Sequence, residues 1–102
     1  MAIDLRNVSK YPHFKTISVT TDATEVQLPS QCSQFTAGSS ASALFIAQND
    51  ATDGAAMPSD KMFIPASNAF TVRIGRGQSR AESIFISSQA GSATVVVTLE
   101  EL

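Results

Sequence analysis

Apolar residues recur along this chain in short runs, and Ser, Gly, Asn, Asp and Pro separate the runs. Within several runs every second residue is apolar, as in Ile17 and Val19 or in Val26 and Leu28. A period of two is typical of a β-strand that buries one of its faces. The runs predict seven or eight strands near residues 14–20, 24–29, 32–37, 42–48, 61–65, 69–74, 82–88 and 92–101.

Many short strands joined by short turns indicate an antiparallel β-sandwich or jelly roll. We therefore expect an all-β chain that forms a single antiparallel β-sandwich, jelly-roll-like, of these seven or eight strands. No helix longer than about two turns is expected. The apolar positions on one face of each strand predict the core. The expected core residues are Ile17, Val19, Val26, Leu28, Leu44, Ile46, Ile64, Val72, Ile74, Ile84, Ile86, Val95 and Val97.

The beginning of the chain does not follow the strand pattern. It mixes apolar residues with Arg6, Lys10 and His13. We expect residues 1–13 to form an N-terminal arm and residues 14–102 to form the β-sandwich domain. One interpretation is an arm that becomes ordered against a partner, and the other is a frayed terminus. The candidate contact residues of the arm are Ile3, Leu5, Val8 and Tyr11.

Four predicted strands break the alternation in the same way, because each carries three consecutive large apolar residues. The middle residue of such a triplet points to the opposite face from its two neighbours. One interpretation is that loops or the arm cover these middle residues. The other is a subunit interface, since monomers rarely expose contiguous apolar patches. The middle residues are Phe45, Phe63, Phe85 and Val96, of which the three phenylalanines are candidate interface residues.

Composition narrows the class of protein. A chain of 102 residues suits one domain, and its 16% of charged residues is low against a typical ~25%. A surface that lies largely against neighbouring proteins needs little charge. The net charge of −2 argues against nucleic-acid binding, which needs a basic face.

Three sequence features bear on the compartment in which the protein is made. Cys32 is the one cysteine of the sequence, so no internal disulfide forms, and we expect it to be a small buried residue. No apolar run approaches the ~20 residues that a membrane helix needs. The N-terminus lacks the apolar region of a signal peptide. We therefore expect a protein that is made in the cytoplasm and does not enter a membrane.

Three aspartates, Asp50, Asp53 and Asp60, lie in the stretch NDATDGAAMPSD between two predicted strands. A calcium loop of the EF-hand type needs oxygen ligands at alternate positions and a bidentate acid at its end. These aspartates have a different spacing, and strands rather than helices flank them. Asp, Asn and Gly are favoured in turns. We expect a connection that binds no metal, and a calcium site is the alternative.

Three arginines, Arg73, Arg76 and Arg80, surround two glycines in the stretch RIGRGQSR. Glycine-rich turns with arginines can bind phosphate, but the P-loop order is absent. We expect a hairpin turn whose arginines are solvated or lie in an interface.

Enzymatic chemistry finds little support in the sequence. A nucleophilic serine or thiol needs a base, and His13 is the one histidine. Glu25 and Glu82 are single acids on predicted strands, which does not indicate the paired carboxylates of a glycosidase. We expect no catalytic site and no cofactor.

The order of several segments carries a family resemblance. The segments are ISVTTDATEVQLP, CSQFTAGSSASALFIAQND, TDGAAMP, MFIPASNAFTVRI and SIFISSQAGSATVVVTLEEL. Together they resemble small β-sandwich virion proteins of tailed bacteriophages, which include capsid decoration (cement) proteins and other head or tail accessory components. The resemblance covers residues 16–102. Its matching residues are Thr52, Gly54, Met57 and Pro58 in the loop and Ile86, Ser87, Gly91, Ala93, Val95 and Val97 in the closing hairpin.

The resemblance implies a non-enzymatic structural protein of the virion. The first hypothesis is a decoration protein on the capsid surface that binds the major capsid protein, or another virion protein, and stabilises the head lattice. Such a protein is expected to be a homo-oligomer, trimeric or otherwise clustered, to which the arm contributes. The alternative is a tail, neck or fibre accessory module that binds a receptor or carbohydrate. The absence of tryptophan, with Tyr11 as the one tyrosine, favours the cement role, because sugar sites usually offer aromatic platforms.

Overall fold

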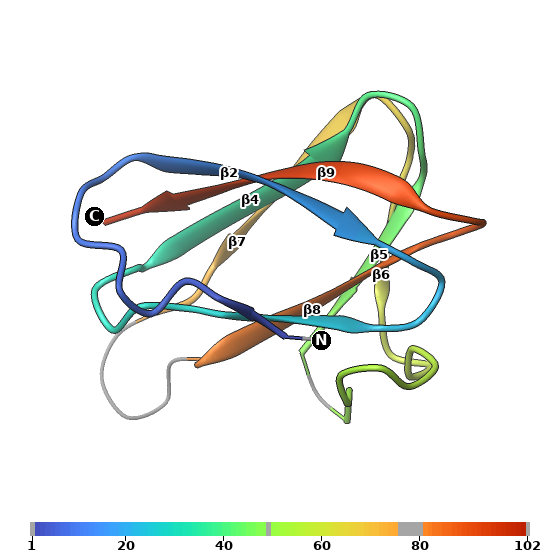
Figure 1. Cartoon of the computed structure of the whole chain (residues 1–102), viewed down its shortest axis with the longest axis horizontal. Coiled ribbons are helices and arrows are strands. Elements are labelled where there is room, and N and C mark those ends of the chain that lie inside the picture. The colour runs from blue at the N-terminus through green and yellow to red at the C-terminus, as the bar shows by residue number, and fades with distance from the viewer. Residues whose placement is uncertain (1, 49, 76–80, 102) are drawn as a thin grey trace.

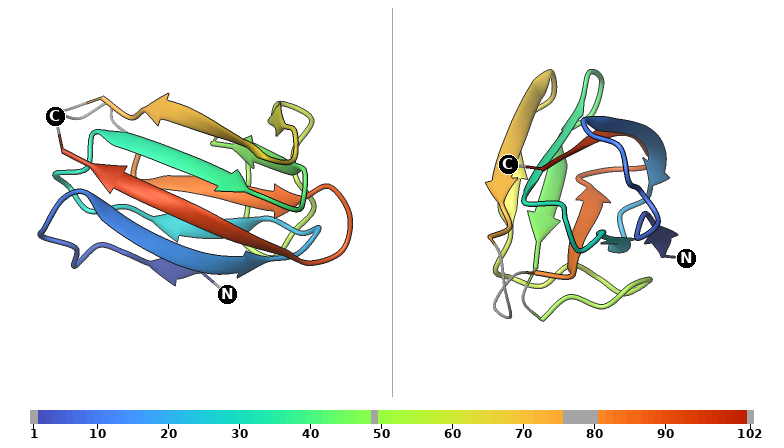
Figure 2. Two further views of the ribbon diagram at one scale, coloured as in Figure 1. Left: turned by 90° about the horizontal axis from the view of Figure 1, so that it is seen from above. Right: turned by 90° about the vertical axis from the view of Figure 1, so that its left-hand side faces the viewer.

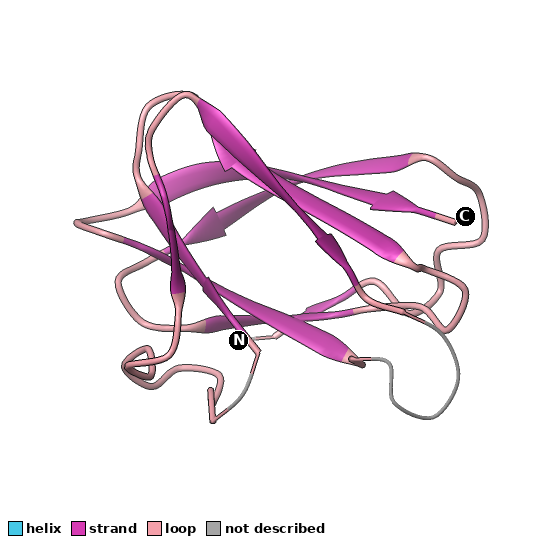
Figure 3. Ribbon diagram, turned by 180° about the vertical axis from the view of Figure 1, so that it is seen from behind, coloured by secondary structure: helices cyan, strands magenta, loops and turns pink. Residues whose placement is uncertain are grey.

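The computed structural model describes residues 2–48, 50–75 and 81–101, which contain strands and loops and no helix (Figures 1 and 3). Each segment predicted to be a strand contains a strand, and one additional short strand lies near the N-terminus. The strands are β1 (Ile3–Asp4), β2 (His13–Val19), β3 (Thr24–Gln27), β4 (Gln34–Ser39), β5 (Leu44–Ala47), β6 (Met62–Ile64), β7 (Asn68–Arg73), β8 (Ser83–Ser88) and β9 (Ala93–Glu100).

The strands form two sheets that face each other across the core (Figure 2). Sheet A has five strands in the order β1-β3-β8-β5-β6, and sheet B has four in the order β2-β9-β4-β7. The layers confirm the expected all-β sandwich. No helix of the described chain is long and apolar enough to cross a membrane.

The pairing follows the order of the strands along the chain. The innermost neighbours β5 and β6 pair with each other, β4 pairs with β7, β3 with β8 and β2 with β9, all antiparallel. Strands β2 to β5 alternate between the two sheets, and so do β6 to β9. The chain is therefore a long two-stranded ribbon that crosses repeatedly from one sheet to the other. The additional pairs β4–β9 and β5–β8 join its turns into sheets.

The core lies between the sheets and is filled by the residues that alternate inward. Strand β9 shows this most clearly, because Ala93, Val95, Val97 and Leu99 are buried while Val96 is exposed. Every expected core residue is buried except Val72, which is half-buried. The thiol of Cys32 is also buried, as expected. Burying an aliphatic side chain contributes about 1.5–3 kcal/mol, so this alternation supplies most of the driving force for the fold.

The N-terminal segment corrects two expectations. Strand β1 pairs with β3 in parallel, so the sandwich is not antiparallel throughout. The backbone N–H of Leu5 donates to the carbonyl of Gln27 at 3.0 Å, and the Leu5 side chain is buried in the core. Ile3, Val8 and Tyr11 pack against the same core. The expectation of an arm outside the sandwich is therefore wrong, because its apolar side chains fill the margin of the core beside β3.

Candidate functional site

An aromatic pair lies on the outer face of sheet A. Phe45 on β5 and Phe63 on β6 are directly opposite each other, with ring centroids 5.7 Å apart and planes inclined by 55°. The ammonium group of Lys61 lies 5.1 Å from the centroid of the Phe45 ring, a cation–π geometry. Phe63 keeps 45% of its surface exposed. We call these three residues the aromatic patch. Its two rings match the sequence-based expectation of outward-pointing middle residues.

Phe85 differs from the other two phenylalanines. It also occupies the outer side of sheet A, but 9% of its surface is exposed. The register places Ala47 on one side of Phe85 and Glu25 on the other. The segment after β5 accepts the backbone N–H of Glu25 on β3 through Asp53. Because β8 lies between β5 and β3 in sheet A, this segment spans β8. Phe85 is therefore covered within one chain, and the loop-cover interpretation holds for it rather than the interface.

The segment that spans β8, residues 50–58, is called the strap, and it also pairs with the edge of β3. The backbone N–H of Ala23 donates to Ala55 at 2.7 Å, and that of Gly54 donates to Ala23 at 2.8 Å. A carboxylate oxygen of Asp53 accepts the N–H of Glu25 at 2.9 Å. Beyond Glu25, β1 pairs with the same edge of β3. The strap and β1 together cover the edge of β3 along its length.

The three aspartates in and beside the strap differ in their surroundings. The backbone N–H of Glu25 lowers the pKa of Asp53 because it stabilises the ionised carboxylate. Asp50 adopts a left-handed backbone conformation with φ of 60°, which Asp tolerates in turns. Asp60 is exposed beside the aromatic patch in sequence. Among the described residues, no group of three or more His, Cys, Asp or Glu could hold a metal ion.

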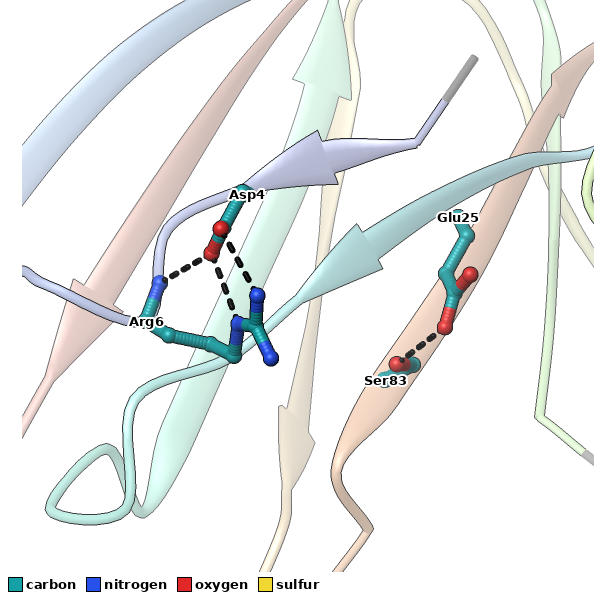
Figure 4. Close-up of polar contacts among 4 residues, drawn as sticks. All are labelled: Asp4, Arg6, Glu25 and Ser83. Atoms are coloured by element: carbon teal, nitrogen blue, oxygen red, sulfur yellow. Dashed lines mark hydrogen bonds and ion pairs between the residues drawn. The ribbon is translucent and has the colours of Figure 1, made fainter.

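A polar depression of about 420 Å³ lies on sheet A next to β1, and Figure 4 shows polar contacts at its side chains. The guanidinium of Arg6 donates two hydrogen bonds to Asp4, each at 2.9 Å, and lowers the pKa of Asp4 to about 2. The hydroxyl of Ser83 donates to Glu25 at 2.7 Å. Asp4 and Glu25 are thus each engaged by a neighbouring side chain. The described lining has no histidine, so it offers no serine–histidine pair of the catalytic-triad type.

The outer face of sheet B is a second surface, and it is rich in hydroxyl groups. The register aligns Phe14, Thr98, Thr36 and Thr71 in one row across all four strands. The hydroxyls of Thr36 and Thr71 are 2.9 Å apart, and Phe14 is 65% exposed. Phe14 was not among the candidate residues. Phe14 and Ile17 lie three residues apart, so the period of two places them on opposite faces of the strand. This pattern identifies Phe14 as an outward-facing residue.

A shallow depression of about 400 Å³ lies on the outer face of sheet B, along the row of residues next to these threonines. Its floor includes Gly38 and the exposed Val96. A Cβ atom on Gly38 would lie 2.8 Å from the backbone oxygen of Asn68, so the strands approach closely there because residue 38 has no side chain. Serine and threonine hydroxyls surround this floor.

The arginine cluster is described in part. Arg73 is exposed at the end of β7, and Gly75 has φ of 85°, as expected of a turn. Arg76 and Arg80 lie outside the described residues.

Comparisons with protein-family models, curated proteins and solved structures give no match for this chain. The described surfaces of the two sheets are the aromatic patch, the polar depression beside β1 and the hydroxyl-rich face of sheet B.

Proposed function

We propose that this chain is a non-enzymatic structural protein of a tailed-bacteriophage virion, and that it decorates and stabilises the capsid. The proposal rests on the aromatic patch, in which Phe63 is 45% exposed and Phe45 half-buried although the same chain covers the neighbouring Phe85. Exposed aromatic rings on a rigid sheet are typical of protein contact sites. The family resemblance of residues 16–102 supplies the expected partner, a capsid protein.

The strand order supports a finer description of the fold as a jelly roll. Eight strands in two sheets, ordered β2-β9-β4-β7 and β3-β8-β5-β6, follow the nested pairing of a folded two-stranded ribbon. A jelly roll consists of eight strands in two packed sheets, and it is common in viral capsid proteins and in lectins. Fold alone does not assign a function, since one fold supports many roles. It is compatible with both hypotheses.

A carbohydrate- or receptor-binding module is the second candidate. The hydroxyl-rich depression on sheet B favours it, because Thr36, Ser40 and Thr98 line it with donors and acceptors. The exposed Phe14 lies opposite Thr98 in the register. The chain has no tryptophan, and its one tyrosine, Tyr11, is half-buried against the core. The decoration role is therefore preferred.

A capsid-binding experiment tests the proposal. The purified protein is mixed with phage heads that lack decoration proteins, and binding is measured by co-sedimentation. We expect saturation at a fixed ratio of protein to capsid subunits. Phe63→Ser should weaken binding by tenfold or more, about 1.4 kcal/mol, while the exposed loop variant Gln89→Ser should bind as the native protein does.

Two outcomes would contradict the proposal. Failure to sediment with heads at any protein concentration would exclude capsid attachment for the heads tested. Binding that Phe63→Ser leaves unchanged would remove the aromatic patch as its basis. Saturable binding to a glycan array, lost in Thr36→Ala and kept in Phe63→Ser, would support the second candidate instead.

A further inference from the structure

We propose that β7 is a dimerisation edge, to which β7 of a second copy of this chain adds in antiparallel orientation. The two four-stranded B sheets would then form one continuous eight-stranded sheet. This inference goes beyond the proposed function and does not rest on the virion role. It follows from the way in which the four outermost strands of the sandwich are protected.

Three of the outer strands carry features that discourage pairing with another chain. Strand β1 has two residues and β6 has three, with Pro65 directly after it. Strand β2 is longer, but Lys15 lies opposite the buried Val97 and therefore on the core-facing side of the strand. Short edge strands, prolines and inward-pointing charges are the devices by which proteins prevent edge-to-edge association.

Strand β7 lacks all of these features. It extends from Asn68 to Arg73, contains no proline, and carries its one charged side chain at its last position. No described residue adds a strand beyond it in sheet B. A six-residue edge strand whose one charge lies at its end is a ready template for another strand.

The hydrogen bonds around β7 identify the backbone groups that face outward. The N–H of Ile74 donates to the carbonyl of Ser33 at 2.9 Å, which extends the ladder between β4 and β7 by one residue. Because N–H and C=O groups alternate in direction along a strand, the groups of Ala69, Thr71 and Arg73 point away from β4. They are the donors and acceptors that a further strand would meet.

These groups permit a symmetric register. If Thr71 lies opposite Thr71 of the second copy, Ala69 lies opposite Arg73 of that copy, and each pair can exchange both of its hydrogen bonds. The same register keeps core-facing residues on one side, with Phe70 opposite Val72 of the second copy. A two-fold interface needs such self-complementarity. It also places the two Arg73 side chains at opposite ends, so that like charges are separated.

The margin of the core beside β7 also favours a partner strand that brings apolar side chains. Phe70 and Val72 point toward the core but stay half-buried. Met62, which shares the inward side of β6 with the buried Ile64, is 50% exposed. The three-residue β6 is too short to cover its longer neighbour in sheet B. A second copy brings the same apolar residues to this margin, so both copies gain the cover that each lacks.

Residue-specific amide exchange of the native protein is the first test. At concentrations where a dimer forms, the N–H groups of Ala69 and Thr71 should exchange at least tenfold more slowly than in dilute monomer. The same alternation, followed from β7 across β4 and β9 to β2, places the N–H of Thr16 on the outer edge of β2. The exchange rate of this N–H should not change with concentration. A chain that sediments as a monomer from micromolar to millimolar concentration would overturn the proposal. So would a dimer whose Ala69 and Thr71 amides exchange as in the monomer.

A matched pair of variants provides the second test. Thr71→Pro removes an outward N–H without touching the ladder to β4, since proline is tolerated on edge strands. It should weaken dimerisation at least tenfold in sedimentation analysis, whereas Thr16→Pro on β2 should not. If either proline variant fails to fold, Thr71→Lys and Thr16→Lys replace the pair with the same expectation. A dimer that Thr71→Lys leaves intact, or that the β2 variant weakens equally, would overturn the assignment to β7.

Discussion

The two long sides of the sandwich differ in how completely they are closed. On the β1–β3 side, the strap and the N-terminal segment pair with the edge of β3, and Leu5 completes the core. On the β6–β7 side, β7 has no further strand among the described residues, and Phe70 and Val72 stay half-buried. Two separate segments thus pair with the edge of β3, whereas no strand among the described residues pairs with the outer edge of β7.

The contrast shows that closure of an edge depends on segments that lie far away in the sequence. Strand β3 is covered by residues that come before it and by a loop that follows β5. An exposed edge carries unpaired backbone groups and is prone to association. The sealed side is therefore expected to serve stability, and the open side to serve contact with other molecules. Four experiments test this division, in order of decreasing expected effect.

The largest effect is expected from Leu5→Ala on the sealed side. Leu5 is 6% exposed, and truncation of a buried leucine to alanine typically costs about 2–5 kcal/mol. Urea denaturation monitored by circular dichroism measures the free energy of unfolding. Val96→Ala, at a position that is 48% exposed, is the control and should cost less than about 1 kcal/mol. An unchanged midpoint for Leu5→Ala would mean that the N-terminal segment is not part of the stable fold in solution.

The next comparison makes the same change on both sides. Val26→Thr places a hydroxyl in the fully buried core beside β1, where an unsatisfied polar group costs about 1–3 kcal/mol. Val72→Thr places it on the open side, where water can reach the hydroxyl. We expect Val72→Thr to cost at least about 1 kcal/mol less than Val26→Thr. Equal losses in the monomer would show that the β7 margin is as well covered as the β3 margin.

The residues themselves show how far this contrast is predictable from sequence. Alternation of apolar and polar positions predicted eight strands and nearly all of the core, because the side chains of a half-buried sheet face inward every second residue. It also placed Phe45 and Phe63 on the outer face. Strand β1 was missed, since two residues are too short to show any period. Its pairing depends on backbone groups of β3 rather than on its own pattern.

The cover over Phe85 could not be predicted for a related reason. Phe45, Phe63 and Phe85 occupy equivalent places in their triplets, and local sequence does not distinguish them. Phe85 is buried on the β8 strand that the strap crosses, and the strap is attached beyond β8 by backbone hydrogen bonds with Ala23 and by the hydrogen bond between Asp53 and Glu25, 28 residues apart. A contact of this range has no signature in a single sequence. The aspartates indicated a turn, but not the strand that it would cover.

Asp53→Ala tests the attachment of the strap. The substitution removes the acceptor for the Glu25 N–H and should destabilise the fold by about 1 kcal/mol at pH 7, since the carboxylate is partly exposed. The pKa of Asp53 is lowered in the folded state, so its contribution is present above the unfolded-state pKa of about 4 and is lost as the pH falls through the folded-state pKa. The difference between native protein and variant should therefore shrink in acid. Asp60→Ala is the control, and an equal loss for it would contradict a specific role of Asp53.

The smallest effect is expected from Ser87→Ala, which reports how tightly the sealed side is closed. Ser87 is 1% exposed on the outer side of sheet A, and among the described residues its hydroxyl has no hydrogen-bond partner. If the cover over β8 stays closed in solution, removing this hydroxyl should leave stability unchanged or raise it by less than about 1 kcal/mol. Ser88→Ala is the matched control, because the Ser88 hydroxyl donates to the carbonyl of Ala90 at 2.9 Å and is also buried. That control should lose about 0.5–1.5 kcal/mol. If Ser87→Ala lost as much as Ser88→Ala, the Ser87 hydroxyl would have a partner in solution, and water would reach the side of the sandwich that the structure shows as closed.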